Sequence, residues 1–291
     1  MRYIKSRAKS QRSKVKTRAA RASSLIRGSG FGLRVLPSFI RHSSFVNRTS
    51  GLGLGLCLGL CLAAETPGGE EILRKVDQNA YADTRVAVAQ IVIHLARNTR
   101  TVKAKSWVKG EDKSFTEFLY PPRDAGTKML KLGDELWMYT PETDRTIRIS
   151  GHMLRQSVMG SDLSYEDMME DRKLLDEYSA AATGEDSVRG RKCWVLELTA
   201  KVPDVSYASR KVWVDEERYV PLREERFAKS GKLLKTTEVT GVSRHEGRWV
   251  ADHITFRDAL KAGAGTEFVV DSLRLNVSIP DYIFSKASLK K

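Results

Sequence analysis

The chain has few cysteines, and most of them lie in one short segment. Of its three cysteines, Cys57 and Cys61 fall within the apolar run of residues 51–64, so the rest of the chain contains only Cys193. One cysteine cannot form an internal disulfide, which excludes a disulfide-stabilised scaffold. The roughly 227 residues after the run are enough to build a hydrophobic core of their own.

The sequence also lacks a long hydrophobic run. Residues 51–64 make up 14 positions, whereas a membrane-spanning helix needs about 20. Basic residues before this run and small residues at its end predict a signal peptide, with cleavage after Ala63 or Ala64. Lipidation of Cys57 or Cys61 is an alternative, although a leucine precedes each of them. We therefore expect an exported, periplasmic protein.

Acidic residues are absent from the first 64 positions, which carry 13 of the 50 lysines and arginines. The remaining chain has 37 basic and 36 acidic residues, so its net charge is +1 although the whole chain has +14. This distribution argues against nucleic acid as a partner of the exported domain. For residues 1–50 we expect a disordered basic extension from a start codon placed too far upstream; an organelle presequence and a nucleic-acid-binding arm are the alternatives.

Motifs of catalysis are also missing after residue 64. The sequence has no Gly-x-Ser-x-Gly elbow, no phosphate-binding glycine loop and no Cys-His signature around Cys193. None of its histidines there pairs with another at metal-ligand spacing; they are His94, His152, His245 and His253. We expect no enzyme, no cofactor and no metal, and we expect Cys193 to be buried filler.

Apolar periodicity predicts two helices. Residues 70–82 carry an apolar stripe that includes Ile72, Leu73 and Val76. Residues 163–178 are predicted as the second helix, with Ser164 and Asp167 as a capping box.

Alternating apolar and polar residues, punctuated by glycine and proline turns, predict about 11–12 strands in a single domain, residues 65–291. Short turns between successive strands favour an antiparallel meander, and a sheet of this size curls. The fold is thus α+β but mainly β, with the helices covering the concave face. The predicted strands are residues 86–96, 101–109, 114–120, 127–132, 135–140, 145–149, 192–200, 209–214, 220–229, 232–243, 248–259 and 266–278.

Four segments resemble the outer-membrane lipoprotein-sorting proteins of the LolA-like group. They are residues 120–141 (YPPRDAGTKMLKLGDELWMYTP), 159–168 (MGSDLSYEDM), 211–215 (KVWVD) and 219–223 (YVPLR). The resemblance extends over residues 70–283 and implies an incomplete, unclosed antiparallel β-barrel wrapped over helices around an apolar cavity.

The same resemblance implies a monomeric periplasmic carrier or chaperone. It would bind the acyl chains of a lipid or lipoprotein for transfer to the outer membrane, and similarity to members associated with an inner-membrane lipid-exporting transporter suggests lipid cargo. An acyl chain of about 15 methylenes costs on the order of 12 kcal/mol to expose to water, so a carrier needs a comparably apolar cavity. The alternative is a non-catalytic envelope interaction module that acts as an accessory subunit of such a transporter.

Methionines suggest where the cavity lies, because all six that follow Met1 fall within 41 residues. Methionine side chains are flexible and suit surfaces that accept varied apolar partners, although plain core packing is the alternative. Period-two alternation puts two aromatic residues on one face of residues 135–140 and a methionine on the other. The lipid-cavity candidates are Trp137, Met138, Tyr139, Met153, Met159 and Met168. Residues 150–164, with Gly151 and Gly160, are predicted as a mobile lid or, alternatively, a plain connecting loop.

Overall fold

The computed structural model describes residues 67–291 apart from residues 96 and 204. The predicted basic extension and signal peptide lie outside the described residues. Within them, one antiparallel sheet of 13 strands dominates, and no helix is long and apolar enough to cross a membrane. The longest helix is α1 (Gly69–Ala80).

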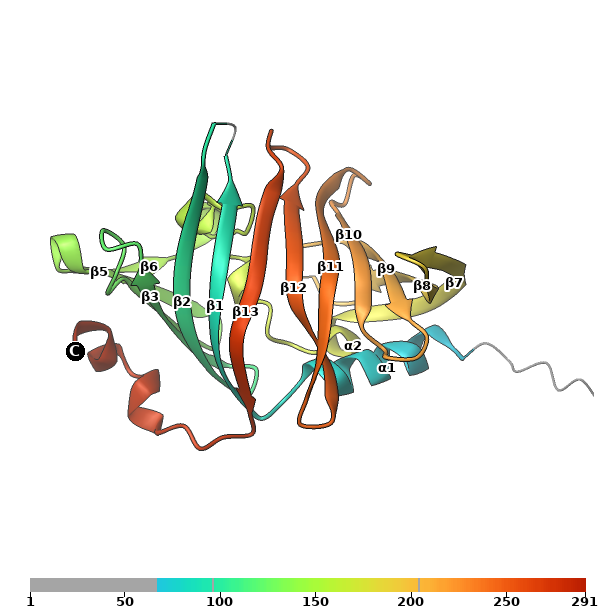
Figure 1. The fold of residues 1–291 in the computed structure, drawn as a ribbon, viewed down its shortest axis with the longest axis horizontal. Helices are drawn as coiled ribbons and strands as arrows, with labels where there is room; N and C mark the ends of the chain where they lie inside the picture. Colours follow the sequence, from blue (N-terminus) through green and yellow to red (C-terminus); the bar gives the residue numbers. More distant parts are fainter. Residues whose placement is uncertain (1–66, 96, 204) are drawn as a thin grey trace, which may run out of the picture. The chain divides into compact units, whose positions relative to one another are not determined.

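The sheet has an unusual strand order, shown in Figure 1. The first and last strands, β1 and β13, pair in its middle, so its two edges are β6 and β7, which are consecutive in the chain. The strands are β1 (Thr84–His94), β2 (Thr99–Lys109), β3 (Lys113–Tyr120), β4 (Lys128–Leu132), β5 (Glu135–Thr140), β6 (Arg145–Ile149), β7 (Tyr178–Val188), β8 (Arg191–Ala200), β9 (Ser209–Asp215), β10 (Pro221–Phe227), β11 (Leu233–His245), β12 (Arg248–Asp258) and β13 (Gly265–Leu275).

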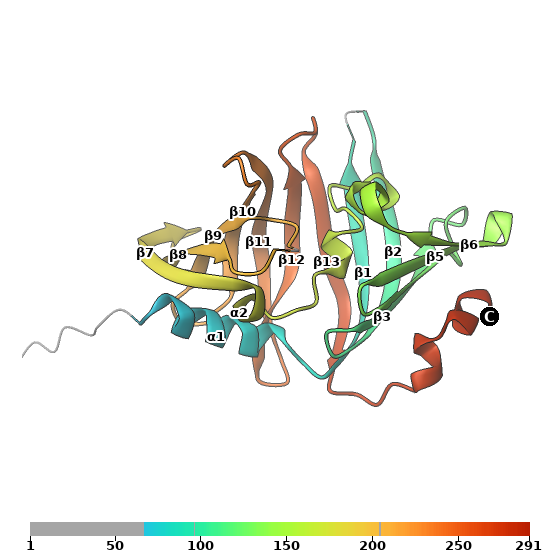
Figure 2. The same cartoon turned by 180° about the vertical axis from the view of Figure 1, so that it is seen from behind.

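Residues 150–177 connect β6 to β7 and therefore have to cross the whole sheet. We call them the crossing segment. They lie on the same side of the sheet as α1, as Figure 2 shows, and we call this side the inner face. The segment contains only single turns of helix: η2 (Gly151–Arg155), η3 (Val158–Gly160), η4 (Asp167–Met169) and α2 (Leu174–Glu177).

Helix α1 forms because its apolar residues share one stripe. Ile72, Leu73 and Val76 are buried against Tyr178 and the inner-face side chains of β8 and β9. On the other side of the sheet, which we call the outer face, the C-terminal turns η5 (Asp281–Phe284) and η6 (Lys286–Lys290) pack over β3 to β5. The sheet thus has a partial cover on each face.

The predicted fold class is confirmed: the protein is mainly β, with one unclosed antiparallel sheet and few helices. The helix predicted over residues 163–178 is wrong, because that stretch is irregular apart from η4 and α2. Strand β7 was not predicted, which is why the count is 13. It is an edge strand with mostly exposed, polar or small residues, so it lacks the apolar alternation that marks a half-buried strand.

Close packing of α1 on β7 gives a test of the fold. A Cβ atom at Gly69 would lie 2.7 Å from both the Ala180 carbonyl oxygen and the Ala182 nitrogen. Backbone atoms cannot move aside as a flexible side chain can, so Gly69→Ala should lower the free energy of unfolding by about 1–3 kcal/mol in urea denaturation. Gly184→Ala, also on β7 but facing open space, is the control and should not lower it.

Candidate functional site

The six methionines that follow Met1 gather at one place on the inner face. Met129 is a buried member of an apolar cluster formed by β1 to β6, and the other five pack against that cluster. Met138 comes from the sheet and the remaining four from the crossing segment: Met153, Met159, Met168 and Met169. Thioether side chains therefore fill the contact between the segment and this half of the sheet.

The structure separates the predicted cavity residues into two groups. Met138, Met153, Met159 and Met168 lie together in this methionine-lined contact. Trp137 and Tyr139 lie on β5 as Met138 does, but their side chains are on the outer face, where they pack against the C-terminal turns. The predicted alternation along β5 is confirmed, and it places the two aromatic residues on the opposite face from the methionines.

The first part of the crossing segment folds back on itself. Val158 N–H donates to the Leu163 carbonyl at 2.8 Å, and Glu166 N–H donates to the Leu154 carbonyl at 2.8 Å. Its tight turn needs left-handed backbone conformations, which Met159 (φ 51°) and Gly160 (φ 77°) adopt. Glycine takes this conformation without strain, whereas methionine does so rarely.

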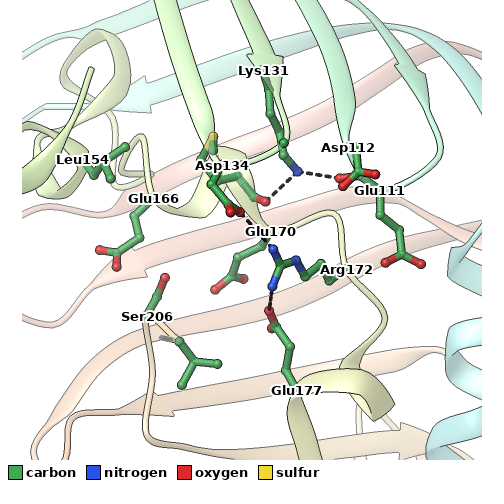
Figure 3. Close-up of a pocket in the computed structure, with 13 residues that line it drawn as sticks. Glu111, Asp112, Lys131, Asp134, Leu154, Glu166, Glu170, Arg172, Glu177 and Ser206 are labelled. Carbon is green, nitrogen blue, oxygen red and sulfur yellow. Dashed lines mark hydrogen bonds and ion pairs between the residues drawn. The ribbon is translucent and has the colours of Figure 1, made fainter. Parts of the chain in front are cut away.

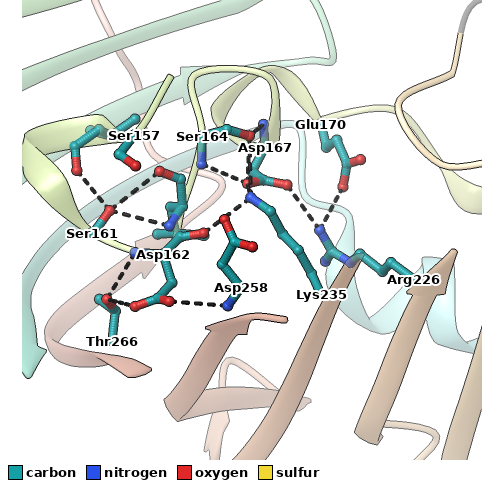
Figure 4. Close-up of polar contacts among 12 residues, drawn as sticks. Ser157, Ser161, Asp162, Ser164, Asp167, Glu170, Arg226, Lys235, Asp258 and Thr266 are labelled. Atoms are coloured by element: carbon teal, nitrogen blue, oxygen red, sulfur yellow. Dashed lines mark hydrogen bonds and ion pairs between the residues drawn. The ribbon is translucent and has the colours of Figure 1, made fainter. Parts of the chain in front are cut away.

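Asp162 ties this folded loop to the middle of the sheet, as Figure 4 shows. Its carboxylate accepts from the Thr266 hydroxyl at 2.7 Å and from the Asp258 N–H at 3.0 Å. Lys261 donates to the Ser161 carbonyl at 2.7 Å. These bonds attach the loop to the ends of β12 and β13.

Asp167 is the centre of a second, charged attachment, which Figure 4 also shows. Ser164 N–H donates to its carboxylate at 2.7 Å and Asp167 N–H donates back to the Ser164 hydroxyl at 3.2 Å. These are the two hydrogen bonds expected of the predicted capping box, but the helix that it was predicted to cap is absent. Tyr207 Oη donates at 2.5 Å, Arg226 lies 3.3 Å away and Lys235 forms an ion pair with the same carboxylate. Burial favours the protonated acid, but Lys235 and Arg226 outweigh it and hold the pKa of Asp167 below its usual range.

Arg210 extends the charged network to β9. It donates to Glu170 at 2.8 Å and to Glu224 at 2.9 Å, and Arg226 pairs with the same two carboxylates at 3.3 and 3.0 Å. Burial opposes the charge on Glu224, but the two arginines hold its pKa below its usual range. A charge buried this deeply is tolerated only when it is paired, so the network specifies one position for Asp167 and Glu170 of the crossing segment.

Two of the pockets that adjoin the crossing segment share part of their lining. The hairpin pocket, of about 830 Å³, lies beside the loop and is lined by residues that include Leu163, Tyr207, Leu234, Lys235 and Leu260. The turn pocket, of about 420 Å³, lies towards the β2–β3 and β4–β5 turns and is shown in Figure 3. Both are lined in part by Glu166, Val205 and Ser206, so they flank the same stretch of chain.

Charged side chains dominate the turn pocket. Lys131 on β4 donates to the carbonyls of Glu111 and Met169 at 2.8 and 2.9 Å and pairs with Asp171 at 3.0 Å. Lys131 is therefore a third attachment of the crossing segment to the sheet, after those at Asp162 and Asp167. The acidic residues on the wall of the turn pocket are Glu111, Asp112, Asp134, Glu166, Glu170 and Glu177.

Among the described residues, no group of three His, Cys, Asp or Glu is placed to hold a metal ion. His94 and His253 both contact Glu267, at 2.8 and 3.0 Å, and lower its pKa. Cys193 is buried, as predicted, and burial raises the pKa of its thiol to about 11, so it is a poor nucleophile at neutral pH.

The charged network was not predicted from the sequence. Arg210, Glu224, Arg226 and Lys235 lie on strands that the sequence did predict. One signal was present: Arg210 precedes Val212 and Val214 at a spacing of two and thus shares their buried face. A charged residue in register with buried valines indicates a paired charge inside the protein.

Comparisons with known proteins agree with this architecture. A family model described as an uncharacterized protein matches residues 110–291. A DUF1329 family protein from Desulfovibrio piger is 26% identical, with a TM-score of 0.68; the match covers 75% of this chain and 96% of that one. No curated protein sequence matches the chain.

Two further solved structures share the fold. A putative outer membrane lipoprotein-sorting protein domain from Vibrio parahaemolyticus is 24% identical with a TM-score of 0.65, over 77% of this chain and 98% of that one. A LolA superfamily protein from Nitrosomonas europaea is 24% identical with a TM-score of 0.64, over 77% of this chain and all of that one. The resemblance to LolA-like proteins is thereby confirmed for the fold.

Removing the charge at the centre of the network should be costly. Asp167→Asn leaves Lys235 and Arg226 without their shared carboxylate in a site where Asp167 is 4% exposed, so the free energy of unfolding in urea should fall by about 3–5 kcal/mol. Asp281→Asn removes one partner of an ion pair at a carboxylate that is 73% exposed. This control should change stability little, and equal losses in both variants would contradict the assignment.

The network also predicts an acid-sensitive fold. Because the pKa of Asp167 and that of Glu224 are lower in the folded than in the unfolded state, their contribution is complete above the unfolded values near pH 4. It is lost as the pH falls through the folded values. In urea denaturation, the free energy of unfolding should therefore decrease less between pH 6 and pH 2 for Asp167→Asn than for the wild type. Parallel curves would show that Asp167 does not titrate with folding.

Proposed function

The chain belongs to the family whose model matches residues 110–291 and shares its fold with LolA-like proteins, and we propose that it is a periplasmic carrier or chaperone for the acyl chains of a lipid or lipoprotein on their way to the outer membrane. The acyl chain binds on the inner face, between the crossing segment and β1 to β6. The protein performs no covalent chemistry in this role.

The observation that carries this proposal is the methionine-lined contact. Four methionines of an irregular segment cover an apolar cluster on half of the sheet. Flexible, unbranched side chains resemble short pieces of acyl chain and can be rearranged around a ligand at low cost. The closed structure thus represents the state without cargo, in which methionines occupy the space that an acyl chain takes when it binds.

In this proposal the hairpin pocket is the route by which an acyl chain enters the contact. Leu163 lines the pocket and belongs to the same folded loop as Met159. Leu234 and Leu260 extend its apolar wall, while Arg155 and Lys229 add positive charge. A lipid with an anionic head group and an apolar tail has complementary groups for both parts of this wall.

Bound lipid is the direct test of the carrier proposal. Native mass spectrometry and lipid extraction of the protein purified from its own periplasm should find an acylated molecule in stoichiometric amount. The purified protein should also take up a fluorescent fatty acid such as cis-parinaric acid. The absence of both bound lipid and uptake would overturn the proposal.

Polar substitution inside the contact should weaken uptake selectively. Met153→Gln combined with Met168→Gln keeps side-chain length but adds buried amides, so cis-parinaric acid affinity should fall on the order of tenfold or more. Ile283→Gln makes a similar change in the cover of the outer face and is the control. If the double variant is folded and binds as well as the wild type, these methionines do not line the site.

A second function is favoured by a different observation. The walls of the turn pocket are mostly charged, and the apolar cluster is already filled by the protein's own side chains. Both features suit a non-catalytic interaction module, such as an accessory subunit that docks onto an inner-membrane lipid-exporting transporter. Copurification with such a transporter, together with no lipid in the extraction described above, would favour this function over the carrier.

A further inference from the structure

Three hairpin tips of the sheet lie at the same end of the central strands, as Figure 1 shows. The strand register brings this about: His94 pairs with Gly265, Lys235 with Asp258, and Phe227 with Leu233. The tips are residues 95 and 97–98 between β1 and β2, 228–232 between β10 and β11, and 259–264 between β12 and β13. We call this set the hairpin end.

The hairpin end exposes large apolar side chains. Leu95 is 48% exposed and Leu260 is 60% exposed. They come from separate hairpins on neighbouring parts of the sheet, since β1 and β12 both pair with β13. Exposed leucines at projecting tips cost solvation free energy in water unless a partner covers them.

The same end is basic. Its three tips carry Arg97, Lys229, Lys232 and Lys261, all exposed, and the sequence of the tips contains no acidic residue. Lys261 is held by the Ser161 carbonyl, whereas Arg97, Lys229 and Lys232 extend the charge to the outermost positions. The other end of β2 leads into a turn with Glu111 and Asp112 instead.

We propose that the hairpin end docks onto the surface of an anionic phospholipid bilayer, with Leu95 and Leu260 inserted among the acyl chains and the basic residues placed at the head groups. Interfacial binding depends on buried apolar area together with attraction to anionic lipid, and this end offers both. A second copy of the chain is a poor occupant, since two such basic ends repel each other. The surface is distinct from the methionine-lined contact and does not depend on what cargo that contact holds.

The position of the hairpin pocket agrees with this orientation. Lys229, Leu260 and Lys261 belong to the docking tips and also line the pocket. Docking at the tips therefore brings this part of the pocket wall close to the membrane. A lipid tail leaving or entering the bilayer meets the apolar wall of the pocket without crossing bulk water.

Vesicle flotation tests the proposal. The protein, as purified from cells, should float with vesicles of phosphatidylglycerol and phosphatidylcholine, and much less with phosphatidylcholine alone. Lys229→Gln with Lys232→Gln should weaken binding about thirtyfold, from the contribution of each basic residue near an anionic surface. Leu95→Ser with Leu260→Ser should weaken it by at least about tenfold, because two leucines no longer insert.

Matched controls separate this surface from general effects. Arg74→Gln with Lys113→Gln removes the same charge from exposed positions elsewhere, and Leu119→Ser removes a leucine that is 41% exposed on β3. Both controls should float like the wild type. Equal losses in tip and control variants, or equal binding to neutral and anionic vesicles, would overturn the proposal.

Different results would contradict the membrane-docking proposal and the carrier proposal. A tip variant that no longer floats but still takes up cis-parinaric acid from solution supports membrane docking and leaves the carrier proposal intact. Flotation unchanged in all tip variants overturns membrane docking whatever the result for lipid uptake. If the tips instead bind an acidic protein and not vesicles, the bilayer is the wrong partner.

Discussion

The two edge strands of the sheet, β6 and β7, are neighbours in the chain but lie twelve strands apart in the sheet. The residues that connect them cannot take a short path, because β6 and β7 form the two opposite edges of the sheet. The crossing segment lies over the inner face, where it meets both apolar and charged strands. Its own sequence supplies both kinds of contact, with four methionines for the apolar cluster and Asp167 and Glu170 for the charged strands.

The apolar and the charged contacts of the segment have different physical properties. Dispersion and apolar burial hold the methionine side chains of the segment, and these interactions are non-directional and tolerate exchange of one apolar group for another. The folded loop itself is also held by the hydrogen bonds of Asp162 and Lys261. Ion pairs and hydrogen bonds to β9, β10 and β11 hold Asp167 and Glu170, and these have one low-energy arrangement. A ligand can thus replace the first set of contacts while the second keeps the segment on the sheet.

Sequence periodicity predicted the elements whose burial differs between their two faces. Helix α1 and twelve strands came out near their observed bounds, and residues 135–140 and 145–149 matched β5 and β6. Strand β7 was not predicted because an exposed edge strand has no buried face and therefore no alternation of apolar and polar residues. Residues 163–178 were predicted as a helix with Met168, Leu174, Leu175 and Tyr178 on its buried face. Instead, Leu174, Leu175 and Tyr178 pack with α1, whereas Met168 packs in the methionine-lined contact, so they do not form one helical stripe. The methionines were identified from sequence, whereas their convergence on one cluster depends on the strand order, which no local pattern encodes.

The central claim is that an acyl chain displaces methionine side chains between the crossing segment and the sheet. All methionines after Met1 lie in that contact, so [¹³C-methyl]methionine NMR observes it with six probes. Titration with palmitate should move most of the six resonances together, in a saturable manner and with one affinity. Methionine resonances that stay in place while palmitate is shown to bind would contradict the account.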